Sequence, residues 1–337
     1  MSKTKTLATI CYYMQLHKLA YFLNRKRKRI VTFHNVLPDD IFESNVANGV
    51  SNSLTEFRTI IDEIAKRFGF SLDIDDPKTV TITFDDGYRN QVEVAGKYLL
   101  SRNIPAVLFV SGRLLASGDN GTIGDNTLII DLLLHWISYA PNGSYSIAYN
   151  GNTTKFFLMS DNRLAIWSKY IWPGFKSDSR SRGKNLLDAL DKSFSIQNIL
   201  ESLSSEYVKQ RLEPASLGQY KDLEKAGWII GWHTTSHYPL SLLSYEEKFE
   251  ELKPNELCSK DILSFPYGGS GEVDEDCLNI AKQLGYKSAV SNVDIPNALS
   301  GKWFRSRMTI SADSILLHFE LSGLKHLLKY RKLLPKL

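Results

Sequence analysis

The chain lacks the cysteine pattern of a disulfide-stabilised protein or of a cysteine zinc site. Its 337 residues include three cysteines, Cys11, Cys258 and Cys277, which are odd in number and far apart. No close-spaced pair is present that could begin a disulfide framework or hold a zinc ion. We therefore expect all three to be small buried apolar residues in a reducing compartment.

Long hydrophobic runs are also missing. Residues 7–23 are rich in apolar side chains, but Gln15, His17 and Lys18 interrupt them and no small-residue cleavage site follows. The basic run at 25–29 comes after this stretch, whereas a signal peptide carries its charge before it. No other segment is as long as a membrane span. These features predict a cytoplasmic protein.

Acidic residues are absent from both ends of the chain. Residues 1–30 contain eight basic residues and no acidic one, and five more basic residues follow Glu320 without an acid. Because the formal net charge is only +4, the segment between the two ends carries −9. This distribution argues against general nucleic-acid binding. It leaves the basic ends free to contact an anionic surface, such as the inner face of a membrane.

The basic ends are expected to be helical. Tyr12, Leu16, Leu19 and Leu23 fall on one stripe of a helix within residues 1–29. Such a basic amphipathic helix either lies on an acidic surface or packs on the main domain, and the sequence does not choose between the two. A second basic helix is expected over residues 313–337.

Between the ends, predicted strands and helices alternate. Strands are expected at 29–34, 79–84, 104–110, 228–232, 261–265 and 286–291, and helices at 53–68, 91–102, 245–252 and 274–284. The regularity fades over about 113–217, which we interpret as a long insertion. Alternation of this kind predicts an α/β fold with a parallel sheet, open or closed, in one domain over residues 30–312.

Polar side chains gather where these strands end. Asp85 and Asp86 directly follow one expected strand. His233 and His237 follow another, four residues apart as on a helical turn, and His34 closes a third. In an α/β barrel such ends share one face, where active sites form. Each signal alone is weak, because an Asp-Asp-Gly is usually a turn, but together an aspartate and two histidines suit zinc or a similar divalent ion.

Three strings in this chain resemble the polysaccharide deacetylases of carbohydrate esterase family 4, which share the NodB homology domain. They are T-F-D-D-G-Y at 83–88, H-T-T-S-H at 233–237 and F-P-Y-G-G at 265–269. The resemblance implies a distorted (β/α) barrel of about seven strands. It also implies metal-dependent removal of an acetyl group from an N-acetylated sugar of a surface polysaccharide or its lipid-linked precursor, with zinc as the expected metal.

The resemblance also implies site residues. Asp86, His233 and His237 would bind the metal, and Asp85 would be the general base. The backbone N–H of Tyr267 would bind the oxyanion that develops on the acetamide carbonyl.

The general acid is less clearly marked. Many members use a histidine in a late L-x-H string, and Leu316, Leu317 and His318 fit that string. If residues 313–333 were one helix, however, His318 would lie on its basic, solvent-facing side. His34 is the better candidate, because circularly permuted relatives place a strand-ending histidine before the Asp-Asp motif.

The chain departs from the family pattern at two points. Ser264 and Phe265 stand where many members carry an arginine that orients the base. Arg305 and Arg307 are candidates to replace it, with a surface or ion-paired role as the alternative for each. Asp294 is a weak candidate for the aspartate of a further motif.

Two other functions remain open from the sequence. The first is an amidohydrolase acting on a small cyclic amide such as a ureide, which the long insertion disfavours. The second is a catalytically silent glycan-binding protein, which the intact aspartates and histidines disfavour.

Overall fold

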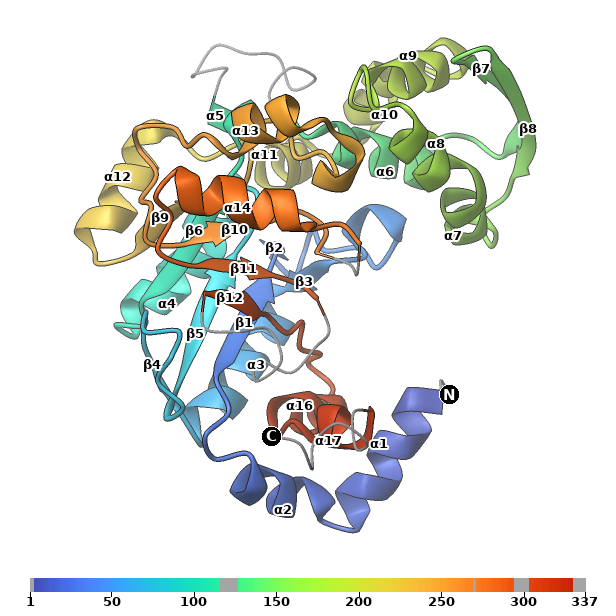
Figure 1. The fold of residues 1–337 in the computed structure, drawn as a ribbon. Helices are drawn as coiled ribbons and strands as arrows, with labels where there is room; N and C mark the ends of the chain where they lie inside the picture. Colours follow the sequence, from blue (N-terminus) through green and yellow to red (C-terminus); the bar gives the residue numbers. More distant parts are fainter. Residues whose placement is uncertain (1–2, 116–126, 269–270, 294–302, 330–337) are drawn as a thin grey trace.

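The computed structural model describes residues 3–115, 127–268, 271–293 and 303–329 (Figure 1). At its centre seven parallel strands follow one another in the order β1-β5-β6-β9-β10-β11-β12. They are β1 (Arg29–Phe33), β5 (Thr79–Phe84), β6 (Ala106–Val110), β9 (Ile229–Trp232), β10 (Leu263–Ser264), β11 (Ala289–Ser291) and β12 (Phe304–Ser306). A short strand, β4 (Gly69–Phe70), pairs with the start of β5.

The sheet curves round until its two outer strands meet. Met308, just after β12, forms a parallel bridge with Val31 of β1. Thr32 N–H donates to the Met308 carbonyl over 3.0 Å, and Met308 N–H donates to the Ile30 carbonyl over 2.9 Å. The expected α/β fold with a distorted barrel of about seven strands is therefore confirmed. β10 and β11 are shorter than the sequence predicted.

Side chains alternate between the inside and the outside of this barrel. The apolar inside residues form one cluster, which consists of Ile30, Val107, Phe109, Ile262 and Val290. The opposite faces of the strands pack against surrounding helices. These are α3 (Leu54–Ala65), η2 (Gln91–Gly96), α4 (Lys97–Ser101), α12 (Leu217–Lys225), α13 (Tyr245–Leu252) and α14 (Glu275–Gln283). The filled interior leaves the carboxyl ends of the strands as the place for polar chemistry.

Serine caps explain several helix starts. Ser53, Ser216 and Ser244 each accept a hydrogen bond from the backbone three residues on and begin a capping box. The helix expected at 91–102 begins instead with the π-helical segment η2. Serine caps thus set where these helices begin, but they do not determine whether a helix is of the α or the π type.

The insertion lies beyond the carboxyl ends of the strands (Figure 1). Its described elements are α5 (Gly112–Leu115), α6 (Ile129–Tyr139), β7 (Gly143–Tyr149), β8 (Asn152–Leu158), α7 (Arg163–Ile166), η4 (Trp167–Ile171), α8 (Trp172–Ser177), α9 (Lys184–Ser193), α10 (Ile196–Ser202) and α11 (Ser205–Leu212). The β7-β8 hairpin was not predicted from the sequence, although Asn150 and Gly151, both with positive φ, form a typical hairpin turn.

A buried ion pair inside the insertion is also hydrogen-bonded to the barrel. Arg211 of α11 donates to Asp131 of α6 over 2.6 Å. The hydroxyl of Tyr88, which ends the T-F-D-D-G-Y string, donates to the same carboxylate. Smaller elements complete this region: β2 (Asn35–Leu37), η1 (Val46–Asn48), β3 (Ser51–Ser53) and η5 (Leu240–Leu242).

The expected N-terminal helix is divided in two. α1 (Lys3–Tyr13) and α2 (Leu16–Leu23) meet at Gln15, whose φ of 58° breaks the helical register. The two helices therefore bury Ala8, Cys11 and Ala20. Leu19 and Leu23 of the predicted stripe are exposed.

The expected C-terminal helix is also divided. Gly323, with a φ of 78°, separates α16 (Ser314–Leu321) from α17 (Leu324–Lys329). The expectation that His318 faces solvent is wrong, because α1 and α2 cover α16: the His318 ring is stacked on His17 and its Nδ1 lies 3.1 Å from the Tyr21 hydroxyl.

Cys11, Cys258 and Cys277 are all free and buried, as expected. Among the described residues, no helix is both long enough and apolar enough to cross a membrane.

Candidate metal centre

The ends of β5 and β9, which lie on either side of β6 in the sheet, bring Asp86, His233 and His237 together. Hydrogen bonds to the adjacent strands hold the two segments, since Asp85 N–H donates to the Phe33 carbonyl over 3.1 Å and His233 N–H donates to the Val110 carbonyl over 3.0 Å. One ligand atom from each of the three residues lies within 4.8 Å of the others. The Asp86 Oδ1 atom is 3.3 Å from His237 Nε2 and 3.7 Å from His233 Nε2. All three side chains are buried.

The chemistry of these three groups fits a divalent cation. Asp86 Oδ1 is buried and has no hydrogen-bond partner. His233 Nδ1 lies 2.9 Å from the Ser264 carbonyl, which assigns the proton to that nitrogen and leaves Nε2 as a lone-pair donor facing Asp86. Burial lowers the pKa of His233 to about 4 and that of His237 to about 3, so both rings are neutral, as metal ligands must be.

The pKa of Asp86 also indicates that a cation belongs in this site. Burial, with the nearby Asp131 and Asp85 carboxylates, raises the pKa of Asp86 well above its ordinary value. A buried carboxylate in this position needs a positive charge close by to stay ionised. A divalent cation between Asp86 and the two imidazoles would supply that charge.

The backbone of the site is strained. Asp86, Thr234, His237 and Tyr267 all have positive φ, which side chains with a Cβ rarely adopt. They make up half of the eight non-glycine residues with positive φ in the described part of the chain. His233 and His237 therefore sit on an irregular loop and not on the helical turn that their spacing suggested. Such strain concentrates at functional sites.

Asp85 points to the other side of the centre and meets Arg307. The guanidinium donates from Nη1 to Asp85 Oδ1 over 2.7 Å and from Nη2 to Oδ2. The Ser264 hydroxyl donates to Oδ1 over 3.2 Å. Burial alone would raise the pKa of Asp85, but the charge and hydrogen bonds of Arg307, together with His233 and His34, outweigh burial and hold the pKa well below its ordinary value. Asp85 is therefore an ionised carboxylate at neutral pH.

Of the two candidate arginines, Arg307 contacts Asp85 and Arg305 does not. Arg305 does not reach Asp85, because its guanidinium binds Asp75 over 2.7 Å. Both residues point to the same side of the strand, and Arg305 lies two residues nearer the amino-terminal end of the barrel. Only Arg307 therefore meets the site. Asp294 lies outside the described residues.

His34 lies beside Asp85. Its Nε2 atom is 3.9 Å from Asp85 Oδ2, and its side chain is 22% exposed. Burial lowers the pKa of His34 below its ordinary value. The structure thus brings His34, Asp85, Asp86, His233 and His237 to one place, while His318 lies under α1 and α2 at the opposite end of the barrel (Figure 1).

Tyr267 forms one wall of the centre. Its ring lies 4.8 Å from the His237 ring, centroid to centroid, and its hydroxyl donates to the His237 carbonyl over 2.9 Å. A Cβ on the following Gly268 would lie only 2.3 Å from the backbone nitrogen of Asn292. The Tyr-Gly step therefore needs its glycine to bring this segment close to the sheet.

Two supporting residues escaped the sequence analysis. Glu251 of α13 accepts hydrogen bonds from Ser236 N–H over 2.8 Å and from Arg182 Nε over 3.1 Å, and so holds the loop between the two histidines. Gln91, at the start of η2, donates to the His34 carbonyl over 2.7 Å and accepts from Gly87 N–H over 3.0 Å. No sequence signal identifies Glu251. The four-residue spacing between Gly87 and Gln91 is the signal that could have identified Gln91.

A hollow adjoins the centre. It has a volume of about 590 Å³ and lies between the loop at 44–50 and the insertion. Tyr267 is shared between this hollow and the metal centre. The other lining residues are mainly aromatic and aliphatic, among them Trp167, Trp172 and Ile130.

No family model and no curated protein sequence matches this chain. Several solved structures are similar to it in fold. The deacetylase PplD of Streptococcus pyogenes, solved in complex with acetate, is 13% identical, with 88% of this chain and 97% of that chain covered at a TM-score of 0.50. IcaB of Ammonifex degensii is 15% identical, with 89% and 97% covered at a TM-score of 0.50. A de-N-acetylase of Aggregatibacter actinomycetemcomitans is 14% identical, with 88% and 99% covered at a TM-score of 0.50.

At these identities the comparisons establish the fold. The chain has structural similarity to polysaccharide deacetylases over about 88% of its length.

Proposed function

We propose that this protein is a metal-dependent N-deacetylase that removes the acetyl group from an N-acetylated sugar of a surface polysaccharide or its precursor and releases acetate. One observation carries the proposal. Three neutral or anionic metal-binding groups with an unpartnered carboxylate oxygen lie next to a second carboxylate, Asp85, that an arginine keeps ionised. The deacetylase-like fold gives that arrangement its reaction class.

A divalent cation, for which zinc is the expected choice, would polarise the acetamide carbonyl and lower the pKa of a bound water to about 7. Asp85 is placed to accept a proton from the attacking water, because it is ionised and lies beside the cation ligands. Its low pKa makes it a weak base that does not keep the proton.

The proton then has a short route to the leaving amine. His34 Nε2 is 3.9 Å from Asp85 Oδ2, and burial, which lowers the pKa of His34, favours a neutral ring that can take up a proton from Asp85. His34 would donate the proton to the departing nitrogen, while the backbone N–H of Tyr267 binds the oxyanion.

The adjoining hollow favours a sugar within a larger molecule. Aromatic and aliphatic side chains line most of it, and a ligand pocket of this size and character accommodates more than an acetamide group. A small cyclic amide would leave most of the hollow unused.

The test is acetate release from N-acetylated oligosaccharides, measured before and after treatment with a chelator and again after adding zinc back. We expect release that the chelator abolishes and zinc restores. Asp85→Asn should reduce kcat by at least about 100-fold, because it removes the base. Asp75→Asn is the matched control, since Asp75 pairs with Arg305 outside the site, and it should keep its activity.

Absence of zinc-dependent acetate release from every glycan tested would reject the proposal. Hydrolysis of a ureide by the same preparation would then identify an amidohydrolase. Glycan binding without hydrolysis would identify a catalytically silent binding protein.

A further inference from the structure

Exposed apolar side chains concentrate on one small part of the molecule. Sixteen large apolar residues are exposed in the described part of the chain, and seven of them lie within residues 7–23. The seven are Leu7, Ile10, Tyr13, Met14, Leu19, Phe22 and Leu23. Single exposed apolar residues are ordinary, but a cluster of this density marks a binding surface.

The cluster is the outer face of α1 and α2. Their inner faces bury Ala8, Cys11 and Ala20 against Phe319 and Leu324 of α16 and α17. The fold has therefore already covered one side of each helix. The other side has no partner among the described residues.

On each helix the exposed residues share a face. Leu7, Ile10 and Met14 follow the i, i+3, i+7 spacing along α1 and the turn that continues it, with Met14 N–H donating to the Ile10 carbonyl. Leu19, Phe22 and Leu23 follow the i, i+3, i+4 spacing along α2, and this stripe is the outer surface of that helix.

Cations border this face, and the N-terminal segment that carries it contains no acidic residue. Lys18, Arg25 and Lys26 are exposed, and the first acidic residue of the chain is Asp39. The Arg25 guanidinium lies 5.1 Å from the centre of the Phe22 ring, so charge and apolar surface meet directly. The nearby Asp313 carboxylate is already paired with Lys5.

We propose that the outer face of α1 and α2 docks on an anionic lipid bilayer. The apolar side chains would enter the boundary between head groups and acyl chains, and Lys18, Arg25 and Lys26 would contact anionic head groups. Charge decides between this occupant and a second copy of the chain. Pairing two copies through this face would bring their cations together without a single acid from either copy's segment, whereas an anionic bilayer complements them.

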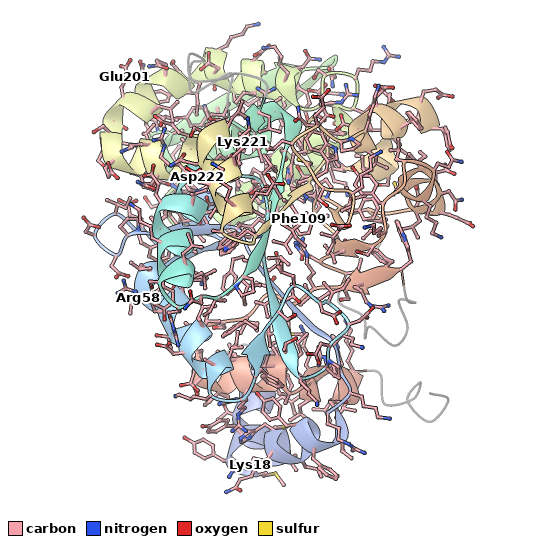
Figure 2. The ribbon with its side chains drawn as sticks, turned by 90° about the vertical axis from the view of Figure 1, so that its left-hand side faces the viewer. Lys18, Arg58, Phe109, Glu201, Lys221 and Asp222 are labelled. Carbon is pink, nitrogen blue, oxygen red and sulfur yellow. The ribbon has the colours of Figure 1, made fainter. Side chains whose placement is uncertain are left out.

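Docking fixes which way the active site faces. α1 and α2 lie at the amino-terminal ends of the strands, and the metal centre lies at the carboxyl ends (Figure 1). In Figure 2, Lys18 of α2 marks one end of the molecule and Glu201 of the insertion the other, with Phe109 of the barrel between them. A docked molecule would hold its site away from the lipid and meet sugars that project from the surface.

The test is cosedimentation of the full chain with vesicles of neutral phosphatidylcholine or of phosphatidylcholine with 30% phosphatidylglycerol. We expect binding to the anionic vesicles that weakens as salt is raised, because screening acts on exposed charges. K18S/R25S/K26S should lower the partition coefficient by about 100-fold, as three cations lose their contact with the surface.

A second variant tests the apolar contribution. L19S/F22S/L23S should also release the protein from anionic vesicles, and its melting temperature should stay close to that of the parent, because all three side chains are already exposed. L100S/L217S/L242S is the matched control: it removes three exposed leucines from other faces and should bind as the parent does.

The proposal fails if the parent does not bind anionic vesicles, or if both N-terminal variants bind as tightly as it does. Sedimentation equilibrium tests the alternative that a second copy of the chain binds this face. A dimer that L19S/F22S/L23S converts to monomer, without vesicle binding by the parent, would assign the face to self-association and overturn the proposal.

Discussion

Replacing Arg307 with glutamine should raise the pKa of Asp85. The guanidinium makes two hydrogen bonds to Asp85, one of them 2.7 Å long, inside a fully buried pair. Removing it leaves a buried carboxylate with only the Ser264 hydroxyl as a described side-chain donor. Such a carboxylate takes up a proton at higher pH.

The size of the shift follows from Coulomb's law. Two unit charges about 4 Å apart attract by about 4 kcal/mol at an effective dielectric constant of 20. At about 1.4 kcal/mol for each pKa unit, losing this attraction corresponds to about 3 units. Measured shifts for an aspartate beside an arginine are about 1–3 units. We therefore expect the pKa of Asp85 to rise by about 2 units in Arg307→Gln.

The sign can be read from the titration of the Asp85 carboxyl group in the metal-free protein, followed by carbon-13 NMR. The Asp85 pKa is depressed in the folded parent, so the carboxylate stays ionised until the pH falls far below neutrality. In Arg307→Gln the titration should move toward neutral pH by about 2 units. Arg307→Lys, which keeps the charge, should give an intermediate shift. Arg305→Gln, on the same side of the same chain segment, should give none.

A folded Arg307→Gln variant whose Asp85 titration coincides with that of the parent would refute the reasoning. It would mean that another group sets the charge of Asp85. Circular dichroism and the melting temperature establish the fold of each variant before the profiles are compared.

Two further predictions concern the support of the site. Glu251→Gln should weaken zinc binding by about tenfold, measured by competition with a chelating dye, because Glu251 holds Ser236 between the two histidines; unchanged affinity would show that the loop needs no such support. Arg211→Met should lower the free energy of unfolding in urea by about 3–5 kcal/mol, because it leaves Asp131 buried without its partner. Lys225→Met, which breaks an exposed pair, should cost less than about 1 kcal/mol, and equal losses in the two variants would contradict this account.

Local patterns carried much of the fold prediction. Alternating apolar residues marked the strand that ends at Phe84, just before Asp85, and a serine marked the start of α3 at Ser53. The site residues could be grouped because parallel strands end on one face. These signals depend on neighbours in the sequence, so they are visible before the chain is folded.

What the sequence could not decide depends on contacts between distant segments. Choosing Arg307 over Arg305 requires knowing how far along the barrel axis each residue lies, which the pairing of β12 with β11 sets. The buried side of the N-terminal segment could not be predicted, because the left-handed conformation of Gln15 rotates α2 relative to α1. His318 was misplaced because its cover comes from the other end of the chain.

The position of Arg307 late in the chain determines when Asp85 gains its partner. During translation, Asp85 is synthesised more than two hundred residues before the arginine that neutralises it. Arg307 is also the neighbour of Met308, whose bridge to Val31 joins the last strand to the first. Until that strand docks, Asp85 of the nascent chain is without its arginine partner. Closing the barrel and pairing Asp85 with Arg307 are therefore one event. If Asp85 is the base, as proposed, a chain released before that strand is made would be inactive even with Asp86, His233 and His237 in place.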